Sequence, residues 1–163
     1  MKCLNYAEFI SVLCRQPQAM ADLMGSSDYP SLRGTVRIFT VDKGTLIAVE
    51  VNGLPSSKNA CESSVLGFHI HSGVSCSGNE KDPFADALTH YNPNACEHPH
   101  HAGDMPPLFS NNGYAFMIFL TDRFSADEVI GKTVIIHAMP DDFKTQPSGD
   151  SGMKIACGII EKG

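Results

Sequence analysis

The histidines are the residues of this 163-residue chain whose types and spacing could support metal chemistry, and there are seven of them. His69 and His71 stand two residues apart in an extended stretch, so both side chains should lie on one face of a strand. Neutral imidazole is a good ligand for copper and for zinc, but histidine is also often a plain polar residue at a half-buried position. Taken alone, this pair leaves both metal binding and a merely polar role open.

A second group of chemically active side chains lies in a segment rich in Pro and Gly. It contains His90, His98, His101 and Asp104. Three imidazoles and one carboxylate form the closed four-ligand set that is typical of a structural zinc site. The segment cannot bury a core of its own, so a metal would stabilise it. A solvated histidine-rich turn is the alternative interpretation, and His100 is an alternative ligand to His101.

Short extended segments separated by turns must position these histidines. Asp42-Lys43-Gly44 and Asn111-Asn112-Gly113 are typical of turns, and Ser125 with Glu128 predicts one capped helical turn. Many short strands with long irregular connections favour an all-β sandwich or barrel. Runs rich in Val, Ile and Thr predict six strands, at residues 34–41, 45–51, 66–70, 115–120, 133–137 and 154–160.

The first 25 residues differ from the rest and predict helices. Asn5 and Glu8 have the spacing of a helix-capping box, and Pro17 suits the first turn of a second short helix. We therefore expect an N-terminal helical extension at residues 1–25 and a β-sandwich domain at residues 26–163.

Charge and hydropathy exclude several functional classes. Twelve Lys and Arg against 18 Asp and Glu give a net charge of -6, which argues against nucleic acid or an anionic membrane as the partner. The longest apolar run, Tyr114–Leu120, is far shorter than the roughly 20 residues that span a bilayer. Polar residues interrupt the first 14 positions, so no signal peptide is expected and we predict a cytoplasmic protein.

Five motifs, in the same order along the chain, resemble those of the copper/zinc superoxide dismutase family. The resemblance extends from about Gly34 to Ile160 and implies an all-β, eight-stranded Greek-key sandwich of immunoglobulin-like type. The motifs are Gly67-Phe68-His69-Ile70-His71, His90-Tyr91-Asn92-Pro93, His101-Ala102-Gly103-Asp104, Ile135-Ile136-His137 with Asp141-Asp142, and the segment 149–158.

The resemblance also implies two metal sites, one for copper and one for zinc. One imidazole, that of His90, would be shared between the metals. Asp141 would bind no metal but would connect the copper ligand His69 to the zinc ligand His98 by hydrogen bonds. Copper would be held by His69, His71, His90 and His137, and zinc by His90, His98, His101 and Asp104.

The reaction that the resemblance implies is conversion of superoxide to O2 and H2O2 by Cu(II)/Cu(I) cycling. His90 would carry the proton, and Lys154 would attract the anionic substrate, with Lys144 adding to the attraction. Lys154 replaces the usual arginine of the family and lacks its planar fork, so we expect slower activity. A non-enzymatic copper-binding or copper-delivery protein on the same fold is the alternative. The complete set of copper positions favours the enzyme.

Among the six cysteines, Cys76 and Cys157 match the disulfide of the family. Cys96, two residues before His98, is an alternative zinc ligand. The superoxide anion is the expected partner of this chain, with no nucleic acid and no membrane, and a homodimer stays open. The cysteines without a counterpart in the family, expected as free thiols, are Cys3, Cys14, Cys61 and Cys96.

Overall fold

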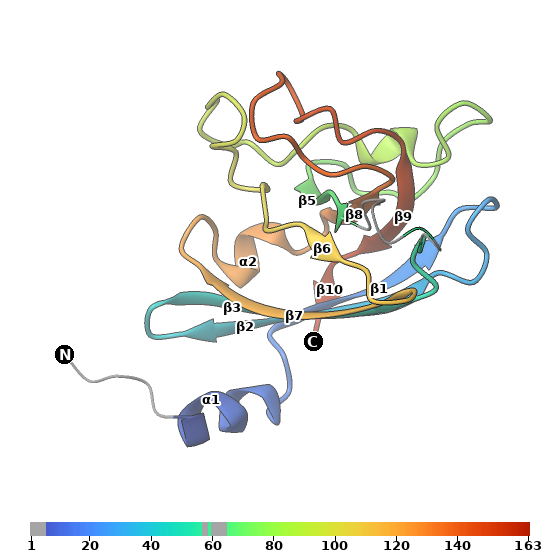
Figure 1. Cartoon of the computed structure of the whole chain (residues 1–163). Helices are drawn as coiled ribbons and strands as arrows, with labels where there is room; N and C mark the ends of the chain where they lie inside the picture. Colours follow the sequence, from blue (N-terminus) through green and yellow to red (C-terminus); the bar gives the residue numbers. More distant parts are fainter. Residues whose placement is uncertain (1–5, 57–58, 60–64) are drawn as a thin grey trace.

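A computed structural model describes residues 6–56, 59 and 65–163 of the chain (Figure 1). Most of the described strands belong to one curled antiparallel sheet, and the described helices are short, so the predicted all-β class is confirmed. The strands follow each other across the sheet in the order β5-β8-β9-β1-β2-β3-β7, and β10 pairs with β1. β4 and β6 form a separate pair. The elements are α1 Tyr6–Leu13, β1 Ala19–Gly25, β2 Arg33–Val41, β3 Gly44–Asn52, β4 Val65–Leu66, β5 Phe68–His71, a 3₁₀ turn Ala85–Ala87, β6 Leu108–Phe109, β7 Tyr114–Thr121, α2 Ala126–Val129, β8 Thr133–His137, β9 Lys154–Ile159 and β10 Glu161–Lys162.

Local sequence signals account for most of these elements. All six predicted strands form, and the one expected at 66–70 is divided between β4 and β5. Asn112 and Gly113 have φ of 53° and 87°, the left-handed conformation that the predicted turn requires. The capped turn also forms as α2, where the Glu128 carboxylate accepts a hydrogen bond from the Ser125 backbone N–H at 2.6 Å.

The N-terminal segment departs from the prediction. The first helix forms as α1, although Asn5 of its expected capping box lies outside the described residues. The second helix is wrong, because residues 19–25 form strand β1, which pairs with β2, β9 and β10. The buried residues of β1 alternate, but two of them, Ala19 and Ala21, are too small to reveal a strand in the sequence. The predicted boundary at residue 25 therefore cuts through the sheet and is wrong too.

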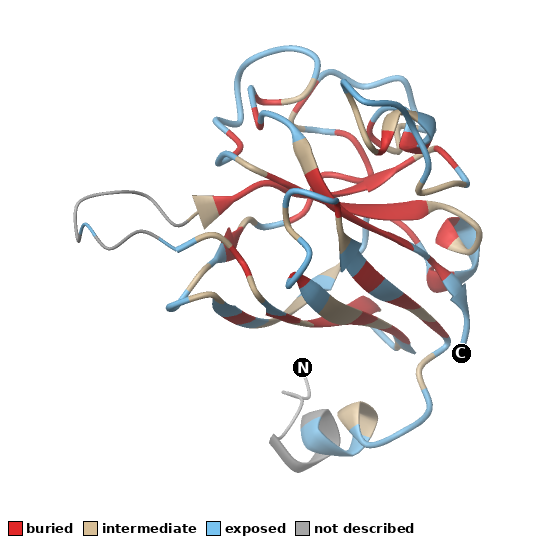
Figure 2. Ribbon diagram, turned by 90° about the vertical axis from the view of Figure 1, so that its right-hand side faces the viewer, coloured by how far each residue is buried: buried red, intermediate tan, exposed pale blue. Residues whose placement is uncertain are grey.

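The core lies inside the curl, where Figure 2 shows the buried residues of the facing strands. α1 lies outside the curl, and its residues Val12 and Leu13 pack against Phe39, Leu46 and Ala48 on the outer face of β2 and β3. Neither of the two described helices is long and apolar enough to cross a membrane.

Two long loops, residues 72–107 and 138–153, cover the end of the sheet formed by β5, β8 and β9 (Figure 1). The first loop returns to the free edge of β5 through isolated bridges, in which His71 pairs with His90 and His69 pairs with Asp104. The backbone of an edge strand thus brings residues distant in sequence beside the histidines of β5.

Candidate metal centre

Strand geometry places the first histidine pair. On β5, Phe68 and Ile70 join the main core, so His69 and His71 point to the opposite face, under the loops. β8, which pairs with β5, ends at His137. All three histidines are buried, and together with His90 they offer four ligand atoms within 4.8 Å of one another. The structure thus brings together the four residues predicted for copper.

The second donor group forms where the 72–107 loop folds back on β5. His98, His101 and Asp104 are buried and, with His90, again place four ligand atoms within 4.8 Å of one another. The loop can approach this closely because residue 103 is glycine: a Cβ there would lie 2.2 Å from the carbonyl oxygen of Ile70. The four residues predicted for zinc are therefore also adjacent.

Hydrogen bonds to carbonyl groups fix the tautomers of two histidines. Nδ1 of His71 lies 2.9 Å from the Leu88 carbonyl oxygen, and Nδ1 of His137 lies 3.0 Å from that of Gly152. Because a carbonyl oxygen only accepts, each Nδ1 must carry the proton. The two Nε2 atoms, 3.2 Å apart, then carry no proton, and their lone pairs repel each other. A cation between them removes this repulsion, so the donor set fits a metal.

Asp141 fixes two further histidines in the same way. Its carboxylate oxygens lie 2.8 Å from Nε2 of His69 and 2.9 Å from Nε2 of His98. Both Nε2 atoms therefore donate, and both Nδ1 atoms are bare. Among the described residues, these buried Nδ1 atoms have no hydrogen-bond partner. Nδ1 of His98 lies 3.2 Å from an oxygen of Asp104, but without hydrogen-bond geometry. A metal in each group would satisfy them.

His90 belongs to both donor groups. Its Nδ1 lies 2.7 Å from an oxygen of Asp104 and 3.4 Å from Nδ1 of His101. Its Nε2 is buried with no hydrogen-bond partner among the described residues. The ring can therefore offer one nitrogen to each group, as a residue shared between two metals must.

Burial keeps the imidazoles of His71 and His137 neutral. Desolvation lowers the pKa of His71 well below its ordinary value and that of His137 to about 3. Burial alone would raise the pKa of Asp141, but hydrogen bonds from His69, from the Phe143 backbone and from His98 lower it to about 2. Neutral imidazoles beside an ionised carboxylate are the protonation states that metal binding requires.

We expect the metal-free chain to lose stability as the pH falls from about 6.5 toward 3. In this range the unfolded chain protonates its histidines while buried His137 stays neutral, which favours unfolding by on the order of 4 kcal/mol. Asp141 adds to the loss as the pH falls from 3.8 toward 2. Denaturant titrations of the metal-free chain at neutral and acid pH measure this effect. A free energy of unfolding that is unchanged at pH values below 6.5 would contradict it.

A cavity of about 660 Å³ opens in front of the first donor group and is lined by His71, His137 and Lys154. Nζ of Lys154 lies 2.6 Å from an oxygen of Asp82, so an ion pair stands at the cavity wall. Lys144 is exposed and does not line this cavity, whereas Lys81 does. The cavity wall therefore carries the cations Lys154 and Lys81 together with the anion Asp82.

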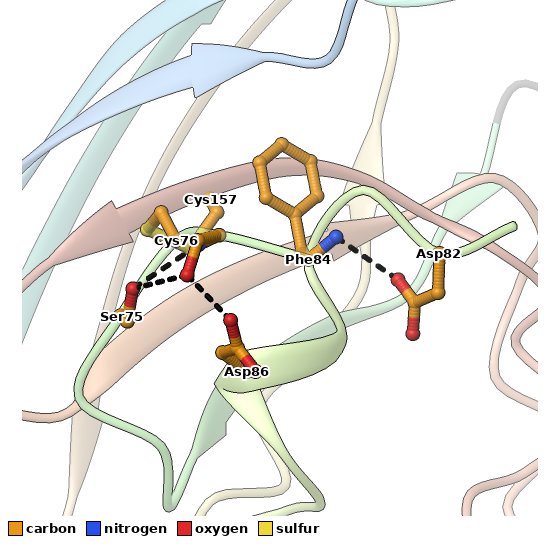
Figure 3. The surroundings of a disulfide bond; sticks show 7 residues. Ser75, Cys76, Asp82, Phe84, Asp86 and Cys157 are labelled. Atoms are coloured by element: carbon orange, nitrogen blue, oxygen red, sulfur yellow. Dashed lines mark hydrogen bonds between the residues drawn. A yellow bond between two sulfur atoms is a disulfide. The ribbon is translucent and has the colours of Figure 1, made fainter. Parts of the chain in front are cut away.

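A disulfide joins the Asp82 loop to the strand that carries Lys154 (Figure 3). The bond links Cys76 to Cys157 on β9, as the resemblance implies. Phe84 packs beside this disulfide, and its backbone N–H donates to the Asp82 carboxylate at 3.0 Å. The position of Asp82 is consequently fixed from two sides.

Several other sequence expectations can be compared with the structure. His100 is exposed and outside both donor groups, so His101 is the better-placed residue. Cys14 and Cys96 are free and exposed, and Cys96 belongs to neither donor group within the part of the chain that the structure describes. Cys3 and Cys61 lie outside the described residues.

Sequence reasoning missed two residues that hold the second donor group. The Gln146 side chain accepts a hydrogen bond from the His98 backbone N–H at 3.0 Å and donates to the His98 carbonyl at 2.7 Å. Arg123 donates to three carbonyl groups of the same loop. Both act on backbone atoms from distant parts of the chain, so no local motif could reveal them.

Comparisons with known proteins agree with this geometry. The family model for copper/zinc superoxide dismutase (SODC) matches residues 32–160. Among solved structures, the copper/zinc superoxide dismutase of Brucella abortus has the same fold, with a TM-score of 0.73 at 24% identity over 88% of this chain and 99% of that one. A double mutant of a SOD-like protein from Bacillus subtilis has a TM-score of 0.67 at 30% identity over 85% and 94%.

Curated relatives extend the similarity over most of the chain. A protein named superoxide dismutase [Cu-Zn] 2 from Salmonella typhimurium is 32% identical, covering 99% of this chain and 100% of the relative. One of the same name from Aquifex aeolicus is 32% identical over 78% of each chain. With the family model spanning most of the sheet and both donor groups, this chain belongs to the copper/zinc superoxide dismutase family.

Proposed function

We propose that this chain converts superoxide to O2 and H2O2, with copper held by the first donor group and zinc by the second. The observation that carries the proposal is the pair of buried four-donor groups that meet at His90. When bound, copper supplies the one-electron chemistry, since alternation between Cu(II) and Cu(I) lets one superoxide be oxidised and the next be reduced. The products also require two protons, which the protein must deliver.

His90 is suited to deliver a proton. Its Nδ1 is held at the second donor group by Asp104 and His101, so the ring keeps its orientation whatever happens at Nε2. Nε2 can therefore take up a proton in one half of the cycle and donate it to the reduced substrate in the other.

Lys154 provides positive charge for an anionic substrate at the cavity wall, but Asp82 compensates that charge at a distance of 2.6 Å. We expect Asp82→Asn to accelerate dismutation several-fold at low ionic strength and to steepen its salt dependence. Glu80→Gln, the same change in charge at an exposed position that does not line the cavity, is the matched control. Steady-state rates across a series of salt concentrations measure both. An Asp82→Asn rate below wild type would contradict the compensation and assign Asp82 to holding Lys154 in place.

The oxidation state of bound copper distinguishes the enzyme from the alternative, in which this chain binds copper without catalysis. The protein loaded with copper and zinc is exposed to pulses of superoxide while the visible absorbance of Cu(II) is recorded. An enzyme reaches the same steady state from the oxidised and from the reduced protein, because superoxide drives both half-reactions. A copper that stays in one state, or changes once and stops, would refute the proposal. Cytoplasmic location stays a prediction from the sequence, and a homodimer stays open.

A further inference from the structure

The turn that carries the second donor group belongs to no helix or sheet strand, and its own backbone N–H groups bond mainly at His100, Gly103 and Asp104. His98, His101 and Asp104 occupy seven consecutive residues that include no helix or named strand. The interval between the two histidines is only two residues. Three ligands on such a turn bind a metal tightly only if the backbone already holds them in place, because ordering it on binding would cost conformational entropy.

Arg123 holds this turn from outside. Its Nη1 lies 3.1 Å from the carbonyl oxygen of Pro99, 3.2 Å from that of His101 and 3.3 Å from that of Asp104. Two of these carbonyls belong to residues of the donor group, and the third belongs to the residue directly after His98. One guanidinium nitrogen with two N–H groups is thus shared among three points of the turn.

The sheet in turn fixes the backbone around Arg123. Its own N–H donates to Oγ1 of Thr121, the last residue of β7, at 3.2 Å. The next residue, Phe124, is buried in the main core, and its carbonyl accepts a hydrogen bond from the buried Thr45 hydroxyl at 2.7 Å. The backbone that carries Arg123 is therefore tied to β3 and β7, and the side chain extends this support to the metal turn.

The charge of Arg123 does not explain its placement. A guanidinium close to the donor group repels a cation, so its electrostatic effect alone would weaken metal binding. Within the described part of the chain, its guanidinium hydrogen-bonds to backbone carbonyl groups and to none of the imidazole or carboxylate atoms that would bind the metal. The two effects predict opposite signs for a substitution, which makes the role of this residue measurable.

We propose that Arg123 is a positioning residue that holds the His98–Asp104 turn in its zinc-binding conformation before the metal arrives. This proposal rests on the assignment of zinc to the second donor group made under the proposed function. Neither the sequence motifs nor the donor groups include Arg123, because it acts through carbonyl groups of a segment about twenty residues earlier in the chain.

The experiment measures the zinc dissociation constant of the full chain by competition with a chromophoric chelator, without copper and without an activity assay. Arg123→Met keeps the length of the side chain but removes its donors, and should weaken zinc binding about 10–100-fold, as outer supports of metal ligands typically do. Arg123→Lys keeps the charge without the planar fork and should bind zinc more weakly than wild type. Arg15→Met, at an exposed arginine of the N-terminal region, is the control and should bind zinc like wild type.

Amide exchange in the metal-free chain provides a second readout. Loss of Arg123 should accelerate exchange of the backbone N–H of His101, which donates to Asp104 within the turn, while the N–H groups of β3 keep their protection. If Arg123→Met does not fold, the zinc affinity and amide exchange of Arg123→Lys decide whether Arg123 positions the turn. Equal or tighter zinc binding in the folded Arg123 variants overturns the positioning role and leaves the proposed function intact. Failure of the wild type to bind zinc overturns both.

Discussion

Replacing His137 with alanine is expected to reduce superoxide turnover by more than about 100-fold, since loss even of an outer support of a metal ligand costs 10–100-fold. His137 supplies one of four donors, and its Nε2 lies 3.2 Å from that of His71. Without it, copper retains three donors on this side, and the cavity loses part of its wall. Turnover per bound copper, with copper affinity measured on the same sample, tests the prediction.

His100→Ala is the matched control for this substitution. His100 lies in the same set of loops, but its side chain is exposed and belongs to neither donor group. Its removal should leave turnover and metal content at wild-type values. Wild-type turnover in folded His137→Ala, or an equal loss in both variants, would show that the first donor group is not the site of the chemistry.

The second large effect is expected for Asp141→Asn. The Asp141 carboxylate accepts hydrogen bonds from His69 and His98, one histidine of each donor group. An amide keeps only one acceptor oxygen, so one of these histidines would face an N–H group and would have to move its proton to Nδ1. Nδ1 is the nitrogen directed at the metal, so this histidine could no longer bind it. The other histidine would keep a hydrogen bond but lose the negative charge of the carboxylate. Both metal affinities should fall, by roughly 10–100-fold for the histidine that changes tautomer.

Asp142→Asn provides the control, because Asp142 is exposed and caps its own turn through Lys144 and Thr145. Metal affinities are measured by chelator competition, one metal at a time. Asp141→Asn also removes a buried charge, so the unfolding of the metal-free protein must be recorded for each variant. Unchanged affinity for both metals in Asp141→Asn would refute the view that Asp141 fixes the tautomers.

Position 149 shows why this network constrains the sequence around it. Gly149 has φ of 68°, and a Cβ there would lie 2.0 Å from the Asp141 carboxylate. It would also lie 2.8 Å from Nε2 of His98. Only glycine leaves room for the hydrogen bond between these two side chains.

Short-range patterns predicted the parts of this protein that depend on neighbouring residues. β8 was expected at 133–137 and has those bounds, because Thr133-Val134-Ile135-Ile136 is a continuous β-branched run. The two-residue spacing of His69 and His71 likewise fixed their common face on β5. Ligand types and spacing also indicated the second group, His90, His98, His101 and Asp104, whereas only the motif resemblance added His137 and the sharing of His90.

Contacts between distant segments account for what the sequence did not reveal. The second helix, expected from Pro17 to Gly25, is replaced by strand β1, which pairs with β2, β9 and β10, and the last two of these lie near the other end of the chain. Asp82 likewise meets Lys154 only through the fold. Lys144 was expected to assist the substrate because it follows His137 in the chain, yet the cavity is lined by Lys81 instead.

The central claim is that the two donor groups together make a superoxide dismutase. The most direct measurement is the rate of superoxide loss catalysed by the chain reconstituted with Cu(II) and Zn(II). The buffer contains a chelator that binds free copper and keeps it from reacting with superoxide. Metal content is counted on the same sample. The two donor groups predict about one copper and one zinc per chain, with superoxide consumed far faster than in the metal-free control. Both metals bound with no rate above that control would contradict the claim.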